Sequence, residues 1–355
     1  MAKTKKAEKE SAAMRISRLV PFAVPSIKKI NKHPKRYKSI SLFAGCGGSS
    51  TGMKMAGFDV IYANEFVDIA ADTYAANATS HTKVDRTDIR KIKFTSLMRE
   101  LGLKEGELDH MDGSPPCSSF STAGKREEDW GKEKAYSEDK VQRTDDLFHE
   151  FCRALRAFKP KTFDAENVSG LVKGMAKGYF REIAKHLEDC GYVVAAQLLD
   201  ASWLGVPQAR QRIVFVGVRK DLAKKYGFKP VFPKPLYRQV TVRECLPDIA
   251  RIKTKVQSVI KYVDSNRPNS TITASDSLTS PTAKFSDGGY IETFDGEQRK
   301  YNIDELRVIC GFPSDFKLLG TYEQQFERLG RSHVPVQMYW VCKTIADEIL
   351  DKIKD

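Results

Sequence analysis

One cysteine stands in a setting that suits chemistry better than packing. Cys117 follows Pro115 and Pro116 and opens a polar loop rich in serine and glycine. The two prolines restrict the backbone to a rigid turn. An isolated cysteine is more often a small buried hydrophobe, but a polar loop offers it no core to fill. A cysteine thiolate is a strong nucleophile, so the pattern indicates covalent catalysis by Cys117.

Side chains that could assist such a nucleophile follow further along the chain. Glu166 comes at the end of a strand-like run, about 50 residues beyond Cys117. Gln208, Arg210 and Arg212 alternate just before another apolar run, and alternate residues of an extended segment share one face. A carboxyl group can move a proton and a guanidinium can hold a polar ring. We therefore expect these residues to form one site.

A glycine-rich turn near residue 46 is typical of nucleotide-cofactor sites. A strand-like run leads into Cys46-Gly47-Gly48 and then into a helical stretch, where glycines let the backbone approach a ligand. Glu65 ends the next strand-like run, the position of an acid that accepts ribose hydroxyls. Phe66 could stack on an adenine, or be an ordinary core aromatic, and Asp88 could accept from the adenine amino group. By itself this pattern fits dehydrogenases and methyltransferases equally.

Alternating elements must position these residues. Helical spacing is found at 144–158 and 177–190, and strand-like runs lie at 39–44, 59–64, 108–112, 162–165, 193–199 and 212–218. The alternation predicts a mostly parallel sheet covered on both faces. The alternation of strand-like and helical patterns stops after Arg219, and Pro, Lys and Tyr dominate to about residue 267. It resumes with 303–310 and a final helix, 336–353.

Composition narrows the class of protein. The chain of 355 residues is 41% hydrophobic and 30% charged, as soluble globular proteins are. No run approaches the roughly 20 apolar residues that span a bilayer. The seven cysteines are scattered without a CxxC pair, which argues against a disulfide framework and a zinc site. We therefore expect a cytoplasmic protein with no metal and no membrane partner.

The net charge of +13 is unevenly distributed. Residues 1–38 contain 12 Lys and Arg against 2 acidic residues, and residues 219–267 contain 13 against 4, so the rest of the chain has a net charge of −6. Two basic segments on an acidic body suggest a polyanion bound at defined places. The first segment is aperiodic and is expected to be a loose arm; the alternative is a merely solvated tail.

The order of these motifs resembles that of the cytosine-5 DNA methyltransferases of bacterial and phage restriction-modification systems. The resemblance spans about residues 39–355. It rests on Phe43-Ala44-Gly45-Cys46-Gly47-Gly48, Asn64-Glu65, Asp88-Ile89, Pro115-Pro116-Cys117, Glu166-Asn167-Val168, Gln208 to Arg212, Arg299-Lys300, Glu305-Leu306, and Gly311-Phe312-Pro313 leading to Gly330. The chain departs from the family at Ser118, often Gln, and at Gly330-Arg331-Ser332-His333, where the family has Gly-Asn-Ser-Val.

The resemblance implies an α/β fold, the S-adenosylmethionine-dependent methyltransferase fold, with a Rossmann-like mixed sheet and a small target-recognition domain. It divides the chain into a flexible arm at 1–38, a catalytic and cofactor-binding domain at 39–218 plus 328–355, and a target-recognition domain at 219–327. The implied cofactor is S-adenosylmethionine. The residues implied to contact it are Phe43, Gly45, Gly47, Gly48, Glu65, Phe66, Asp88, Ile89 and Pro116.

The implied reaction moves a methyl group to carbon 5 of a cytosine that has been flipped out of a short duplex DNA site. Cys117 would add to carbon 6, Glu166 would supply a proton at nitrogen 3, Arg212 would hold the base through its oxygen, and Arg210 would steady the catalytic loop or the phosphates. The loop 118–130 would close over the base. The implied DNA contacts are Ser121, Lys125, Arg126, Gln208, Arg238, Arg243 and Thr271, with Arg251, Lys253 and Lys255 as further candidates.

Three alternatives remain at this point. The same chemistry on tRNA is disfavoured by the basic recognition segment, which favours double-stranded DNA bound by a monomer. A catalytically silent DNA-binding regulator would not need intact Cys117, Glu166 and Arg212. A nicotinamide-dependent dehydrogenase would explain the glycine turn but not the Pro-Pro-Cys turn.

Overall fold

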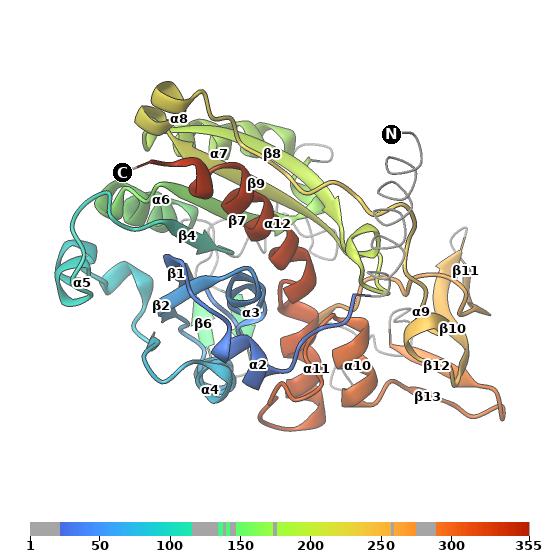
Figure 1. The fold of residues 1–355 in the computed structure, drawn as a ribbon. Helices are drawn as coiled ribbons and strands as arrows, with labels where there is room; N and C mark the ends of the chain where they lie inside the picture. Colours follow the sequence, from blue (N-terminus) through green and yellow to red (C-terminus); the bar gives the residue numbers. More distant parts are fainter. Residues whose placement is uncertain are drawn as a thin grey trace, which may run out of the picture.

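The computed structural model describes residues 22–115, 134–137, 140–142, 147–172, 176–256, 259–274 and 289–354. A large sheet with helices on both faces forms the body, and a smaller sheet lies at one end of it (Figure 1). Between them pack the helices that follow the smaller sheet in the chain.

The large sheet has the strand order β3-β2-β1-β4-β7-β9-β8. Strand β9 is antiparallel to both of its neighbours, and the pairs among β1, β2, β3, β4 and β7 are parallel. This arrangement confirms the predicted Rossmann-like mixed sheet. The strands are β1 (Tyr37–Leu42), β2 (Phe58–Asn64), β3 (Lys83–Asp85), β4 (His110–Gly113), β7 (Thr162–Val168), β8 (Tyr192–Asp200) and β9 (Gln211–Arg219).

Helices cover the two faces with separate apolar cores. On one face, Phe151 and Phe163 belong to the core beneath α5 (Phe94–Glu100), α6 (Leu147–Phe158) and α7 (Ala176–Asp189). On the other, Met53 and Met338 bring together α3 (Gly48–Met55) and α12 (Pro335–Glu348). These two helices pack closely at Gly52. A Cβ at this position would overlap the Pro335 carbonyl oxygen, so only glycine allows the approach. Among the described residues, this body also contains the helices α4 (Asp68–Asn77) and α8 (Lys220–Tyr226) and the 3₁₀ turns η1 (Ile89–Lys91), η3 (Ser169–Val172), η4 (Ala201–Leu204) and η7 (Leu350–Lys352).

The smaller sheet is antiparallel, with the order β11-β10-β12-β13. Ile252 and Ile291 from this sheet share a core with Phe326 and with Cys46 of the glycine turn. The elements of this region are β10 (Ile249–Val256), β11 (Val259–Asp264), β12 (Tyr290–Thr293), β13 (Gln298–Lys300), α2 (Ile27–Lys32), α9 (Val242–Cys245), α10 (Ile303–Ile309) and α11 (Tyr322–Arg331). A further strand pair, β5 (Lys134–Ser137) and β6 (Lys140–Gln142), is antiparallel. The proposed domain limits stay a prediction.

The end of the basic arm is packed, which corrects the expectation of a loose segment through residue 38. Ile27 and Ile30 on α2 are buried against the smaller sheet's core. The Phe22 ring lies 5.2 Å from that of Tyr339 on α12. Apolar residues three apart are the signal of this short helix, masked in the sequence by the surrounding lysines. Residues 1–21 lie outside the described part.

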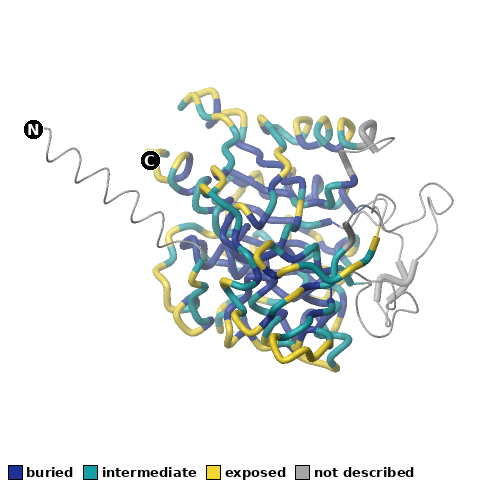
Figure 2. The backbone as a smooth tube through the Cα atoms, turned by 90° about the vertical axis from the view of Figure 1, so that its right-hand side faces the viewer, coloured by how far each residue is buried: buried dark blue, intermediate teal, exposed yellow. Residues whose placement is uncertain are grey.

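Burial follows the two sheets through the middle of the body, and exposed residues form its outer loops and helix faces (Figure 2). Among the described residues, no helix combines the length and the apolar character needed to cross a membrane.

Candidate active site

The glycine turn after β1 is shaped by backbone that ordinary residues avoid. Phe43, Gly45 and Gly47 have φ values of 55°, 56° and 95°. A Cβ at Gly45 would meet no atom within 4 Å, so the space beside this residue is open. A Cβ at Gly48 would instead overlap the His333 carbonyl oxygen. Gly45 therefore leaves room for a ligand, whereas Gly48 allows the chain before α12 to approach.

Glu65 is hydrogen-bonded to the backbone of this turn. Its carboxylate accepts hydrogen bonds from the backbone N–H groups of Gly45 (2.7 Å) and Val67 (2.8 Å). Only 7% of the residue is exposed, and this burial raises the pKa of the Glu65 carboxyl group, while the two N–H donors oppose the shift. The acid is thus held at the turn, beside the half-buried Phe66.

Asp88 is brought to the same edge by a side chain at the end of β2. Asn64 Nδ2 donates to the carbonyl oxygens of Asp85 (3.1 Å) and Thr87 (2.8 Å). Asp88 then caps the 3₁₀ turn η1 by accepting from Arg90 N–H (3.0 Å), and Ile89 is buried. The expected cofactor residues from Phe43 to Ile89 therefore lie along the ends of β1 and β2 and the turn after β3.

A buried polar row crosses the centre of the sheet, and sequence reasoning missed it. Asp112 on β4 accepts from Ser41 Oγ on β1 (2.5 Å) and Ser49 Oγ on α3 (2.7 Å). It is paired in register with Asp164 on β7. Burial raises the pKa of Asp112 to about 8, and the Asp164 carboxylate adds to the shift. Asp112 therefore links the helix of the glycine turn to the strand that leads to Cys117.

His110 completes this row. Its Nε2 lies 2.8 Å from Asp164 Oδ1 and its Nδ1 lies 3.0 Å from Thr162 Oγ1, with both members of the His110–Asp164 pair fully buried. Burial lowers the pKa of His110 to about 4 and raises that of Asp164. The signal in the sequence was the polar residues inside two strand-like runs, His110 and Asp112 in one and Asp164 in the other, which a strand wholly buried on both faces should not contain.

Glu166 and Arg212 meet at the end of neighbouring strands, as expected. Arg212 Nε lies 2.8 Å from Glu166 Oε1, with side chains 13% and 12% exposed. Burial lowers the pKa of Arg212, and Glu166 opposes this effect. The adjacent Asn167 donates from Nδ2 to the Pro115 carbonyl oxygen (3.3 Å). The chain entering the Cys117 loop is thereby fixed beside the Glu166–Arg212 pair.

The buried side chains of Arg210 and Gln208 connect distant segments of the chain by hydrogen bonds. Arg210 is 2% exposed and donates to the carbonyl oxygens of Ile272 (3.0 Å), Gly330 (3.0 Å) and Ser332 (2.8 Å). Gln208 is fully buried, donates to Ile309 O (3.1 Å) and accepts from Ile272 N–H (3.0 Å). Neither side chain reaches the surface in this structure, so a direct contact of Gln208 with DNA or of Arg210 with the phosphates would need another conformation. That Arg210 steadies the catalytic loop stays a prediction.

Three other residues expected to contact DNA form hydrogen bonds within the protein. Arg238 forms a two-pronged pair with Glu244 (2.6 and 2.9 Å). Arg243 donates to Asp264 (3.0 Å), Ser265 Oγ (3.0 Å) and Ala250 O (3.0 Å). Thr271 Oγ1 donates to Ala209 O (2.9 Å). Five further expected site residues, Pro116, Cys117, Ser121, Lys125 and Arg126, lie outside the described residues, as does the loop 118–130.

Residues 330–333, which depart from the family's usual motif, lie between Arg210 and the glycine turn. The Ser332 carbonyl oxygen is bound by Arg210, and the next carbonyl, that of His333, touches Gly48. The His333 ring is buried, and among the described residues neither of its nitrogens has a hydrogen-bond partner. Burial lowers its pKa to about 4. Arg331 pairs with Glu327 (2.8 Å).

Comparison with known proteins agrees with this geometry. The model of the C-5 cytosine-specific DNA methylase family matches residues 37–279. The type II methyltransferase M.FnuDI of Fusobacterium nucleatum is 30% identical over 353 residues, which cover 89% of this chain and 96% of that protein. M.NgoPII of Neisseria gonorrhoeae is 36% identical over 201 residues, 56% of this chain. That second match spans about half of the relative, 53% of its length.

Solved structures share the fold at lower identity. A protein described as a DNA modification methyltransferase encoded within an E. coli prophage gives a TM-score of 0.63 at 20% identity, covering 89% of this chain and 100% of that one. The Dnmt2 methyltransferase of S. pombe gives 0.60 at 17% identity, covering 88% and 99%. Since the family model matches more than half of the chain and M.FnuDI aligns over nearly its whole length, the chain belongs to the C-5 cytosine-specific DNA methylases and is a DNA cytosine methyltransferase.

Proposed function

We propose that the chain methylates carbon 5 of a flipped-out cytosine in duplex DNA, with Cys117 as the covalent nucleophile and S-adenosylmethionine as the methyl donor. The observation that carries the proposal is the Glu166–Arg212 pair of 2.8 Å, beside which Asn167 holds Pro115, two residues before Cys117. A nucleophile, a proton donor and a base-binding guanidinium would then meet at one edge of the sheet.

The residues at the neighbouring strand ends fit the cofactor. The open space beside Gly45 admits a ligand against the backbone. The Glu65 carboxylate, with the ribose hydroxyls as its expected donors, borders this space, and Phe66 and Asp88 follow along the same edge. When bound there, S-adenosylmethionine would supply a methyl group on a positively charged sulfur.

Cys117 and Glu166 would divide the activation of the base. Cytosine carbon 5 is a poor nucleophile until a thiolate adds to carbon 6, which makes carbon 5 electron-rich. Glu166, as the acid, gives a proton to nitrogen 3 and so relieves the charge that addition places on the ring. Arg212 holds the base through its oxygen. Once carbon 5 carries the methyl group, loss of its proton to a base restores the ring double bond, releases the Cys117 thiolate and returns the nitrogen 3 proton to Glu166.

The partners follow from the same proposal. Duplex DNA is the substrate, and its target base leaves the stack at a cost of a few kcal/mol. The basic segment 219–267 supplies positive charge for the polyanion. The free cysteines of the described part suit the reducing cytoplasm, where we expect the chain to act as a monomer.

The test incubates the chain with S-adenosylmethionine carrying a labelled methyl group and with either duplex DNA or tRNA. The wild type and the control Cys245→Ser should label DNA, and Cys117→Ser should not, although it still binds the cofactor. Duplex DNA containing 5-fluorocytosine should form a denaturant-resistant complex with the wild type. The Cys117→Ser variant should form no such complex. Labelling of tRNA only, or near-normal turnover by Cys117→Ser, would contradict the proposal.

A further inference from the structure

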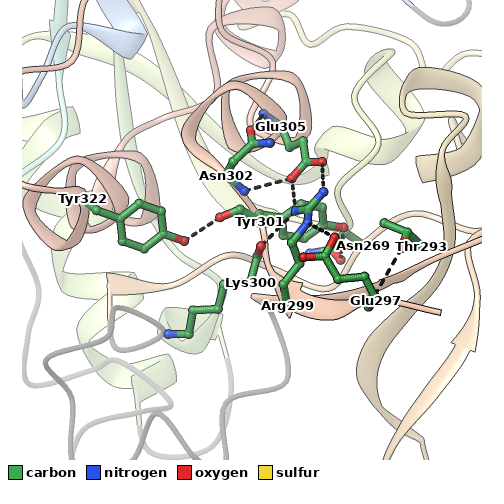
Figure 3. A network of polar contacts seen from close by, with 9 residues as sticks. All are labelled: Asn269, Thr293, Glu297, Arg299, Lys300, Tyr301, Asn302, Glu305 and Tyr322. Atoms are coloured by element: carbon green, nitrogen blue, oxygen red, sulfur yellow. Dashed lines mark hydrogen bonds and ion pairs between the residues drawn. The ribbon is translucent and has the colours of Figure 1, made fainter. Parts of the chain in front are cut away.

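The polar side chains where β13 meets α10 and α11 form a structural network (Figure 3). Arg299 donates to both oxygens of the Glu305 carboxylate (2.8 and 2.8 Å), and the Tyr322 hydroxyl donates to the Tyr301 carbonyl oxygen (2.5 Å). These contacts join three elements of the fold, and none of them involves a thiol. The contact between α6 and α7 differs in this respect, because two cysteines meet there.

Cys152 and Cys190 bring the same turns of α6 and α7 together. Cys152 lies on α6, and Cys190 is the first residue after α7. The Cys190 thiol donates to the His186 carbonyl oxygen (3.1 Å) and to that of Cys152 (3.7 Å). About one turn earlier on each helix, the rings of His149 and His186 lie 4.9 Å apart. The thiol of one helix therefore lies against the cysteine of the other.

The two thiol groups also change each other's acidity. A hydrogen bond from the Cys152 side chain lowers the pKa of the Cys190 thiol, and the positive charge of Arg156 adds to this effect, whereas burial and Asp189 oppose it. The same hydrogen bond, together with burial, raises the pKa of Cys152. Cys190 is therefore the thiol of the pair that ionises more readily.

Exposure distinguishes the two cysteines in the same direction. Cys190 is half-buried, whereas Cys152 is 1% exposed and belongs to the core beneath α6. A small oxidant in solution can thus reach Cys190 first. Cysteines that respond to oxidants combine an accessible thiolate with a second cysteine close by. Cys190 and Cys152 meet both conditions.

We propose that Cys152 and Cys190 form an oxidation site, which a peroxide converts into a disulfide between α6 and α7. The Cys190 thiolate attacks one oxygen of hydrogen peroxide, the O–O bond breaks, and the products are a sulfenic acid and, after protonation, water. The Cys152 sulfur then attacks the Cys190 sulfur, the S–O bond breaks, and a second water leaves. In total the two thiols lose two protons and two electrons, and the peroxide accepts them.

The disulfide would close a loop that carries part of the proposed active site. Residues 153–189 lie between the two cysteines and include β7 with Glu166. Because the thiols are already in contact, the bond would restrict the unfolded chain more than the folded one. We therefore expect the oxidised form to be more resistant to heat, and a dithiol reductant to reverse the effect. This inference does not depend on the substrate of the enzyme.

The test treats the folded full-length chain with hydrogen peroxide, blocks the remaining thiols with iodoacetamide and maps unreduced tryptic peptides by mass spectrometry. The expected product joins peptide 144–153, which contains Cys152, to peptide 186–210, which contains Cys190. Dithiothreitol should separate the two peptides. The matched control is Cys245 in peptide 244–251, which should stay alkylated, because it is also half-buried but burial raises its pKa to about 12.

Two variants separate the steps, and circular dichroism checks that each is folded. Cys152→Ser should leave a sulfenic acid on Cys190, which dimedone traps, whereas Cys190→Ser should leave Cys152 as a thiol that dimedone does not label. In the wild type and in Cys245→Ser, peroxide should raise the melting temperature by a few degrees. Absence of the linked peptides from the oxidised wild type would overturn the inference, whatever the variants show. Dimedone labelling of Cys152 in place of Cys190 would contradict the proposed order of attack.

Discussion

At the scale of single residues, the Glu166–Arg212 pair holds two side chains of the proposed mechanism at one place. Arg212 Nε lies 2.8 Å from Glu166 Oε1, and both side chains are largely buried. In the proposed mechanism, an incoming base would take over Arg212 through its oxygen and would break this pair. Pairing in the free enzyme therefore keeps both side chains in place until substrate arrives.

The corresponding prediction concerns Glu166→Gln. Gln keeps the shape and can still accept a hydrogen bond from Arg212, but it cannot deliver a proton. We expect kcat to fall by about 10²-fold or more, with little change in the Kd for duplex DNA. Methyl transfer under single-turnover conditions measures the effect. Glu105→Gln, an exposed residue paired with Lys159, is the control; equal rates in the two variants would refute the role of Glu166.

Glu65 is expected to act in binding alone. Replacing it by Ala should weaken S-adenosylmethionine binding by about 1.5–3 kcal/mol, the scale of hydrogen bonds to a charged group. The same change also removes the acceptor for Gly45 and Val67 N–H. Glu65→Gln, which keeps one acceptor oxygen, should therefore lose less affinity. Calorimetry that shows unchanged affinity in Glu65→Ala would remove this residue from the cofactor site.

At the scale of elements, the polar row across β1, β4 and β7 makes the sheet sensitive to pH. Asp112 keeps its proton in the folded chain up to about pH 8, whereas an unfolded aspartic acid loses it near 3.8. Folding therefore becomes less favourable as the pH rises between these values. His110, with a pKa of about 4 against 6.5 when unfolded, has the opposite effect below pH 6.5. Lys54, whose pKa burial lowers to about 7, also titrates above pH 6.5, so the effect of Asp112 is isolated by comparing the wild type with a variant that lacks this carboxyl group.

We therefore predict a stability difference between the wild type and Asp112→Asn that changes with pH. Between pH 6.5 and 8 the wild type should lose about 2 kcal/mol relative to the variant. Urea unfolding at several pH values measures it, and the exposed Asp304→Asn is the control. Parallel stability curves for the wild type and Asp112→Asn would show that Asp112 does not retain its proton.

Elements with a clear period could be predicted from the sequence, and those without one could not. The six expected strands and both helices between them are confirmed, within a few residues at their ends. The final helix ends at Glu348, followed by a 3₁₀ turn, earlier than the expected 353. The four strands of the smaller sheet were missed, because Arg251, Lys253 and Lys255 alternate with residues too mixed to stand out as apolar.

The site divides in a similar way. Local sequence placed Glu166, Arg212 and Glu65 at strand ends, and the structure places them there. It could not show that Arg210 and Gln208 point inward, because their partners, Ile272, Ile309 and Gly330, lie 62 to 120 residues away. Nor could local sequence show that Arg238 and Arg243 form ion pairs with carboxylates of the same region. Long-range contacts decided the orientation of Arg210 and Gln208, whereas Arg238 pairs with a residue only six positions away.

At the scale of the whole molecule, we expect the arm and the body to contribute separately to DNA binding. Residues 1–21 contain six Lys and Arg against two acidic residues, whereas the packed segment from Phe22 contributes to the core. Deleting 1–21 should weaken binding about equally on all duplexes and reduce its salt dependence. Bisulfite mapping of a methylated random library should show unchanged site choice. A changed set of sites would mean that the arm reads sequence.

The contact between α3 and α12 also has a consequence for how the enzyme is made. The glycine turn and α3 leave the ribosome early, but the helix that covers them is translated some 280 residues later. Until then Met53 lacks its partner Met338, and Gly48 lacks the chain that holds it. A nascent chain can therefore have every catalytic motif and still lack the packing that completes the proposed cofactor site. For this gene, a stop codon just before α12 should be as damaging as one near the start.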